Sequence, residues 1–354
     1  MQLILDFNDD ATQNEINAFV ALHNLTDVQI LSAAQKCYLV TSDVLLDSTA
    51  GVQVTRNDTN PLTLLTYPQQ TFNTNSPADW WKLSSFVKPD FEAPTQTYDR
   101  RGANATIYLV DSGVNTTHLE FADANVLGLY SFNGNLADIN GHGTALASVI
   151  VGATCGLTNA TIKSVKIFEG GTETLQSHFV SAIDSILSDV ISNPSGLKIV
   201  NMSWSIPKNA YIESKIQLLV DAGVKVVVAA GNSGIPIENV TPASMESVFT
   251  VGAYGQELVP CDFSNYTGPI STTPEATNYG AIDVWAPGED IPAVVSFAQI
   301  GNISGASVAC AIQAAAFAYN SDSNILTDGS LPAAVNAMST LSSFSDKGIL
   351  TLEG

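Results

Sequence analysis

Positively charged side chains are scarce in this chain. It has 13 Lys and Arg against 34 Asp and Glu, which gives a formal net charge of −21 at pH 7. This balance argues against partners that are themselves negatively charged, and we expect neither nucleic acid nor an anionic membrane surface. Hydrophobic residues make up 45% of the 354 positions. That content supports a folded core and excludes global disorder, and the length accommodates one large domain and one small one.

Long apolar runs are missing as well. No stretch approaches the roughly 20 apolar residues that a membrane-spanning helix needs. Residues 1–10 contain neither a basic start nor a long apolar segment, so we predict no secretory signal peptide. The expected location therefore stays open: the cytosol, export by another route, or an assembled particle such as a virion.

Cysteine is limited to four positions, 37, 155, 261 and 310, and none has the Cys-x-x-Cys spacing of a metal site. Cys37 lies in the N-terminal segment, which leaves three cysteines in the rest of the chain. We therefore expect no complete set of disulfides, and a reducing setting fits this usage better. Cys310 is expected to be a buried apolar residue rather than a second nucleophile.

The first 62 residues have the pattern of a small separate domain. Hydrophobic spacing predicts strands at 2–7, 36–41 and 51–55, with helices at 11–24 and 44–47. This order suggests a split βαβ, ferredoxin-like α+β domain. Residues 63–79 are rich in Pro, Asn, Gln and Thr, a linker composition in which the chain could be cut. We expect the junction between Leu62 and Asp79.

The larger domain is predicted to span residues 80–354. Short β-branched runs alternate there with segments of helical spacing, which is typical of buried parallel strands and the helices between them. The expected strands are 106–110, 161–167, 198–202, 225–230 and 248–251, and the expected helices are 143–151, 175–191 and 211–222. The sequence thus predicts an α/β fold with a mostly parallel sheet and helices on both faces. Sites in such sheets lie beyond the carboxyl ends of the strands.

Four polar residues stand at the boundaries of these elements. Asp111 ends an apolar run, while His142 and Ser307 each precede a helical stretch. A serine hydroxyl needs an imidazole to accept its proton, and a carboxylate holds that imidazole in the required tautomer. Asn232 could donate an amide hydrogen to the oxyanion that forms on the substrate, an interaction typically worth about 3 kcal/mol. Together they predict a nucleophilic hydrolase.

The motifs around these residues resemble those of the subtilisin-like serine proteases, nearest the proteinase K branch. Asp-Ser-Gly-Val stands at 111–114, His-Gly-Thr at 142–144, Ala-Ala-Gly-Asn-Ser-Gly at 229–234 and Ser-Gly-Ala-Ser-Val-Ala at 304–309. The order Asp, His, Asn, Ser separates this family from other Ser-His-Asp folds. The resemblance covers about residues 78–350.

The resemblance implies a serine endopeptidase with a protein or peptide substrate, autoprocessed by cleavage of its own inhibitory prosegment at residues 1–62. The substrate-binding positions that it implies are Gly170, Gly171, Ser203, Trp204, Ser205, Ala230 and Gly231. No cofactor is expected. Family members often bind calcium, to which Asp123, Asp138 or Asp262 could contribute here, but the loops do not predict a site.

Several departures from the family pattern leave a second function open. Ala306, Val308 and Ala311 stand where the family usually has Thr, Met and Pro. Ser205 replaces a glycine that lines the primary specificity pocket, so we expect a narrower pocket. These changes would fit a catalytically silent scaffold or binding module, although all four reactive residues are present. An esterase of the α/β-hydrolase type is disfavoured by the chain order and by the missing Gly-x-Ser-x-Gly motif.

Overall fold

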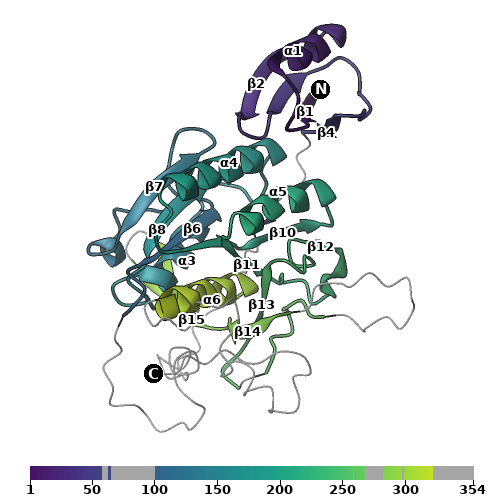
Figure 1. Cartoon of the computed structure of the whole chain (residues 1–354). Helices are drawn as coiled ribbons and strands as arrows, with labels where there is room; N and C mark the ends of the chain where they lie inside the picture. The colour runs from purple at the N-terminus through teal and green to yellow at the C-terminus, as the bar shows by residue number, and fades with distance from the viewer. Residues whose placement is uncertain (58–62, 65–99, 258, 268–281, 297–298, 322–354) are drawn as a thin grey trace.

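The computed structural model describes residues 1–57, 63–64, 100–257, 259–267, 282–296 and 299–321. A small N-terminal domain sits on one side of a large α/β domain (Figure 1). Most of the predicted linker, residues 65–79, lies outside the described residues. Within the described ranges, no helix combines the length and the apolar character needed to cross a bilayer.

The N-terminal domain is a four-stranded antiparallel sheet with one described helix. Its elements are β1 (Gln2–Phe7), α1 (Gln13–Leu22), β2 (Thr26–Ser32), β3 (Cys37–Thr41) and β4 (Val52–Arg56), and the strand order is β2-β3-β1-β4. Helix α1 begins at a capping box, in which Thr12 and Glu15 satisfy each other's backbone N–H groups. Leu3, Leu5 and Ile16 are buried between the helix and the sheet. Alternation along β1 therefore gives this domain a core of its own.

Two local expectations for this domain were wrong. Strand β2 was not predicted, because five of its seven residues are exposed and its apolar alternation is weak. The short helix expected at 44–47 is absent from the described structure. Val44 and Leu45 are exposed there, and the Ser42 hydroxyl forms a local turn by donating to the Val44 carbonyl. Without a buried apolar face, a helix at this position has little to stabilise it.

The large domain is built on a seven-stranded sheet whose neighbouring strands are all parallel. The strand order is β14 (Val284–Pro287), β13 (Phe249–Tyr254), β11 (Lys225–Ala229), β9 (Leu197–Met202), β6 (Ala105–Asp111), β8 (Thr161–Lys166) and β7 (Val126–Ser131). The predicted fold class is confirmed. Strands β7 and β14 lie at the two edges and were not predicted.

Helices cover both faces of this sheet. Helices α4 (Gln176–Ser192) and α5 (Ala210–Asp221) pack on one face, and α3 (His142–Val151) and α6 (Ala306–Asn320) pack on the other. Successive residues of β6 enter opposite cores: Ile107 joins the α3–α6 core, and Tyr108 joins the α4–α5 core. Burial on both faces explains why the central strands have continuous apolar sequences.

Shorter elements connect this framework. They are β5 (Thr63–Leu64), η1 (Leu119–Phe121), β10 (Trp204–Pro207), η2 (Ile237–Asn239), β12 (Val240–Thr241), β15 (Ile291–Ser296) and β16 (Gln299–Ile303). Strand β10 continues from the carboxyl end of β9 and is flanked by β12 on one side and β5 on the other. This small three-stranded sheet borders the site described below.

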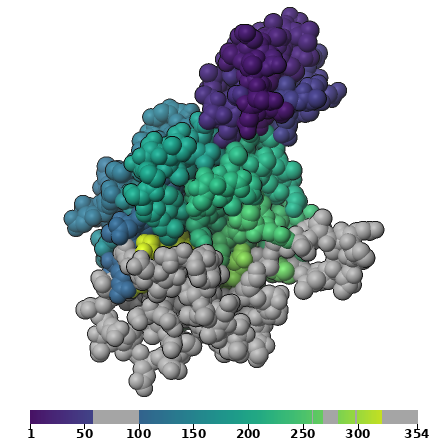
Figure 2. Space-filling view, viewed as in Figure 1, coloured from purple at the N-terminus to yellow at the C-terminus, as the bar shows by residue number. Residues whose placement is uncertain are grey.

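The N-terminal domain packs against α4 and α5 of the large domain (Figures 1 and 2). Ile4, Leu31 and Leu39 share one hydrophobic cluster with residues of these helices. Two polar contacts reinforce it: Lys215 pairs with Asp6, and the Ser32 hydroxyl lies 2.5 Å from Asp184 Oδ1, to which it donates. The outer surface of the two helices is therefore a docking face for this domain.

Candidate active site

Asp111 is the last residue of β6 and is fully buried. Its Oδ1 accepts hydrogen bonds from the backbone N–H of Ser112 at 2.8 Å and from the Ser112 hydroxyl at 3.2 Å. His142 Nδ1 lies 2.9 Å from Oδ1 and 3.0 Å from Oδ2. Since the Asp111 carboxylate can only accept, this pairing assigns the proton of a neutral imidazole to Nδ1. The other ring nitrogen, Nε2, is then an acceptor.

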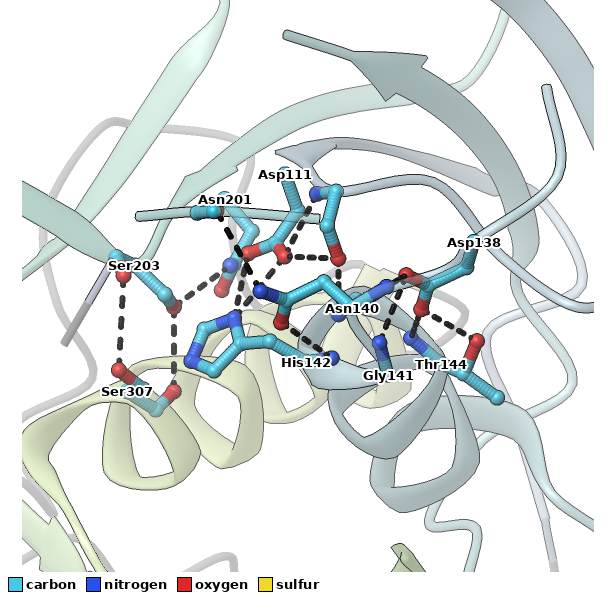
Figure 3. Close-up of polar contacts among 12 residues, drawn as sticks. Asp111, Asp138, Asn140, Gly141, His142, Thr144, Asn201, Ser203 and Ser307 are labelled. Atoms are coloured by element: carbon cyan, nitrogen blue, oxygen red, sulfur yellow. Dashed lines mark hydrogen bonds and ion pairs between the residues drawn. The ribbon is translucent and has the colours of Figure 1, made fainter. Parts of the chain in front are cut away.

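His142 is the first residue of α3, and 12% of its side chain is exposed. Figure 3 shows the ring between Asp111 and Ser307, with the second nitrogen facing Ser307. The His142 imidazole is therefore reachable from the surface, whereas its partner Asp111 is fully buried. This is the arrangement that a base needs if it is to accept a proton from a neighbouring hydroxyl.

Ser307 is the second residue of α6 and is 4% exposed. Its hydroxyl donates to the Ser203 carbonyl at 3.5 Å, and its own carbonyl accepts from the Ser203 hydroxyl at 3.2 Å. Ser203 lies directly after β9, so the two contacts join the start of α6 to the carboxyl end of a central strand. Ser203 was expected only as a substrate-binding residue, and the structure adds these two contacts with Ser307.

Asn232 lies beyond the carboxyl end of β11. Its side-chain Oδ1 accepts the backbone N–H of Ala306 at 2.7 Å. This contact fixes the orientation of the amide: Oδ1 is the acceptor, and Nδ2 is the donor end. Gly305 makes the approach possible: its φ of +151° suits glycine, and an added Cβ would lie 3.1 Å from Asn232 Nδ2. The sequence thus places an amide donor at the start of α6.

The predicted substrate-binding residues fall into three groups. Gly170 and Gly171 are exposed and follow β8. Ser205, in β10, is half-buried, and its neighbour Trp204 pairs with Leu64 through the backbone. The third group, Ala230 and Gly231, connects β11 to Asn232 and is buried.

Trp204 was predicted as a substrate-binding position in one wall of the cleft. Its side chain is fully buried and packs edge-on against Phe179 of α4, with ring centroids 5.1 Å apart. Trp204 therefore contributes its backbone to the site, while its indole belongs to the core. The sequence could not show this, because the residues of a strand alternate between two faces and the register was unknown.

Cys310 lies one turn after Ser307. It is fully buried, and its thiol donates to Asn201 Oδ1 at 3.2 Å. Burial raises the pKa of this thiol above its ordinary value, which disfavours the thiolate form that a nucleophile would need. All four cysteines of the chain are free thiols. Cys310 thus behaves as a small core residue.

Thr174, at the end of the segment 169–174, is held by His178. His178 Nδ1 lies 2.9 Å from Thr174 Oγ1, and the His178 ring stacks on Phe132 with centroids 4.1 Å apart. The Thr174 hydroxyl also contacts the Ile167 carbonyl. Burial lowers the pKa of His178 to about 4 from its ordinary 6.5.

This shift predicts a loss of stability in mild acid. Between pH 6.5 and 4 the unfolded chain binds the proton more readily, so the free energy of unfolding falls as the pH falls through that window. The contribution should not exceed about 3 kcal/mol. Urea denaturation at several pH values would measure it, with Ser307→Ala as the parent to prevent self-digestion. Adding His178→Gln should flatten the slope, and equal slopes in the two proteins would contradict the prediction.

Comparison with known proteins agrees with this geometry. The model of the subtilase family matches residues 102–338. The chain belongs to the subtilase family. It is 32% identical over 265 residues to a cuticle-degrading serine protease of Arthrobotrys oligospora, covering 72% of this chain and 60% of that protein. Alkaline protease 1 of Aspergillus clavatus is 32% identical over 234 residues, covering 65% and 55%. The chain thus spans about 60% or less of the length of these relatives.

A solved structure extends the similarity to three dimensions. The chain superposes on a cold-adapted subtilisin-like serine proteinase with a TM-score of 0.66 and 28% identity. The match covers 79% of this subtilase and all of the other chain. The subtilisin-like fold expected from the motifs is confirmed.

The structure also places the residues considered for calcium. Within the described residues, no three or more His, Cys, Asp or Glu side chains gather as metal ligands would. Asp138 accepts four hydrogen bonds at the start of α3, which is a role that sequence reasoning missed. Nothing in the pattern around residue 138 distinguishes such a role from an ordinary surface carboxylate.

Proposed function

We propose that this protein is a serine endopeptidase in which Ser307 attacks the carbonyl carbon of a peptide bond. The observation that carries the proposal is the 2.9 Å contact between Asp111 and His142, with Ser307 at the other side of the ring. His142 Nε2 accepts the proton of Ser307 as the new C–O bond forms, and Asp111 stabilises the imidazolium. His142 then gives the proton to the leaving amine, and water hydrolyses the acyl-enzyme.

The oxyanion would be stabilised by two kinds of donor. Asn232 supplies its Nδ2–H, whose direction is set by the Ala306–Oδ1 contact. The first N–H groups of α6 point out of the helix beside Ser307, where the helix dipole also favours negative charge. Fixed donors of this kind act only when charge develops on the substrate oxygen, so they lower the barrier rather than merely bind.

We propose that the N-terminal domain acts as an inhibitory prosegment, with the domain docked on α4 and α5 and the segment that follows it bound in the cleft. Thr63 and Leu64, just beyond it in sequence, pair antiparallel with Ser205 and Trp204 of β10. An extended segment that adds a strand at this edge uses the same backbone groups that a substrate would use. The domain also supplies a cap to α4: Asn57 Oδ1 accepts the N–H of Ser177 at 3.2 Å, whereas the helix's own N-cap residue makes no side-chain bond.

The register of β5 suggests which bond is cut. Leu64 pairs antiparallel with Trp204, and the neighbour of Trp204 is Ser203, the residue in contact with Ser307. The direction of β5 is therefore toward the nucleophile. We therefore propose cleavage after Leu65, within the junction expected from the sequence. Intact-mass measurement of the purified protein should then give fragments 1–65 and 66–354.

The proposal is tested with a fluorophosphonate probe and the same mass measurement, wild type beside Ser307→Ala. We expect wild type to bind one probe molecule and to be cut, and Ser307→Ala to do neither. A folded wild type that binds no probe would instead support the catalytically silent scaffold. A probe-reactive wild type that keeps residues 1–65 attached through all preparations would overturn the prosegment role alone.

A further inference from the structure

The start of helix α3 carries an unusual concentration of side-chain hydrogen bonds. Its N-cap residue, Gly141, has no side chain with which to accept the first N–H groups of the helix. Asp138, which lies outside the helix, accepts the N–H of Thr144 in the first turn and two N–H groups of the turn that precedes the helix. Its Oδ1 accepts from the N–H groups of Asn140 at 3.0 Å and Gly141 at 2.8 Å, and its Oδ2 accepts from Thr144 N at 2.9 Å and Thr144 Oγ1 at 2.6 Å.

Asp138 is only 6% exposed, and both of its carboxylate oxygens are engaged. All of these partners donate hydrogen to the carboxylate (Figure 3). A cation could bind Asp138 only by displacing these donors. The contacts therefore indicate that the carboxylate has a structural role and is not a metal ligand. The residue before it is also held, because Lys166 Nζ, buried beneath the loop, donates to the Ala137 carbonyl at 2.5 Å.

The same network reaches the loop that carries Asp111. The Thr144 hydroxyl, which donates to Asp138, accepts the N–H of Asn115 at 2.9 Å. The Ser112 hydroxyl accepts the N–H of Gly143 at 3.0 Å. Two links therefore join the loop after β6 to the first turn of α3, at the two residues that follow His142. We call these bonds, among Ser112, Asn115, Asp138, Gly143 and Thr144, the joint. It connects the loop that carries Asp111 to the helix turn that carries His142.

We propose that Asp138 is a positioning residue for the reaction: it fixes the start of α3 so that the His142 ring meets Asp111 and Ser307 together. The inference rests on the proposed peptidase function. His142 is the first residue of the helix, so any tilt or fraying of the first turn moves its ring directly. A misplacement of about 1 Å in a catalytic group can cost about 100-fold in rate.

Four variants test the proposal. Asp138→Asn turns one acceptor into an amide donor that faces N–H groups, and Thr144→Val removes the hydroxyl that links Asp138 to Asn115. Each should lower kcat about 10-fold to 100-fold with little change in KM, because neither residue lies in the cleft wall. Thr144→Ser, which keeps the hydroxyl, should recover most of the loss. Asp123→Asn, an exposed carboxylate on a neighbouring loop, serves as the control.

The measurements separate positioning from simple stability. Rates are normalised to the fraction of folded protein by circular dichroism, and the second-order rate of fluorophosphonate labelling is measured for each variant. A double variant Asp138→Asn/Thr144→Val no slower than either single variant would support one shared joint. If the normalised rates of Asp138→Asn equal those of wild type, the proposal is overturned.

Failure of the proposed function would be recognised independently. If folded wild type is not labelled at all, the peptidase proposal fails. The positioning role of Asp138 is then tested separately by NMR. The proton between His142 Nδ1 and Asp111 should give a sharp low-field resonance in wild type that is lost or broadened in Asp138→Asn. A resonance that is the same in both proteins would overturn the role of Asp138.

Discussion

Replacing Ser307 with alanine is expected to lower kcat for peptide hydrolysis by about six orders of magnitude, the typical loss when such a nucleophile is removed. Alanine keeps the Cβ at the buried start of α6, so the fold should be retained. The hydroxyl that His142 would deprotonate is gone, and only the oxyanion donors and substrate binding remain to accelerate attack by water. Initial rates on a fluorogenic peptide would measure the loss.

Traces of other proteases limit the lowest rate of hydrolysis that this assay can detect, so a matched control variant is needed. Ser188→Ala changes an exposed serine on α4 and should leave kcat within about twofold, as for most surface substitutions. Intact mass should show Ser307→Ala as one uncut chain, with the N-terminal domain still on α4 and α5. Substantial hydrolysis by purified Ser307→Ala, insensitive to added inhibitors of other proteases, would show that another residue carries the reaction.

The central architecture could be predicted because its determinants are local in sequence. Strands β6, β9 and β11 are short runs rich in β-branched residues and buried on both faces, and a polar residue stands at or shortly after the carboxyl end of each. Parallel strands put those residues at one edge, so Asp111 and Asn232 could be expected to converge. The family motifs added His142 and Ser307. In the structure His142 contacts Asp111, and Asn232 contacts the residue before Ser307.

What could not be predicted depends on pairings between distant residues. The contact between Cys37 and Tyr211 and the ion pair between Asp6 and Lys215 join two domains, and neither leaves a periodic signal in the sequence. Strand β2 was missed because its outward-facing residues hide its alternation. The direction of the Trp204 side chain required the register of β10, which only the structure supplies.

Asp138 shows a different limit. Neither its residue type nor its place in the sequence distinguishes it from an ordinary surface carboxylate, because it stands before Gly141, the N-cap residue of α3. The functional meaning comes from its neighbours in space, because the helix that it starts begins with His142 and is tied to the loop after Asp111. A positioning residue such as Asp138 can be identified only from the hydrogen bonds that connect it to the site in the folded structure.

Asp111→Asn is expected to lower kcat about 10⁴-fold while leaving the fold in place. Asparagine has nearly the same shape, and its Oδ1 can still accept from Ser112. Its Nδ2, however, would face His142 Nδ1 as a donor, so the imidazole must become an acceptor there and carry its proton on Nε2. In that tautomer the nitrogen facing Ser307 cannot accept the hydroxyl proton.

Comparison with Asp111→Ala separates this tautomer effect from the loss of charge. Alanine also removes the carboxylate but places no donor against Nδ1, so the productive tautomer stays accessible. If tautomer control is the main role of Asp111, the Asn variant should be at least as slow as the Ala variant, although asparagine is the closer match in shape. Values of kcat for the folded, active-site-titrated variants would decide this. An Asn variant that is clearly faster than Ala would assign the role of Asp111 chiefly to packing and orientation of the ring.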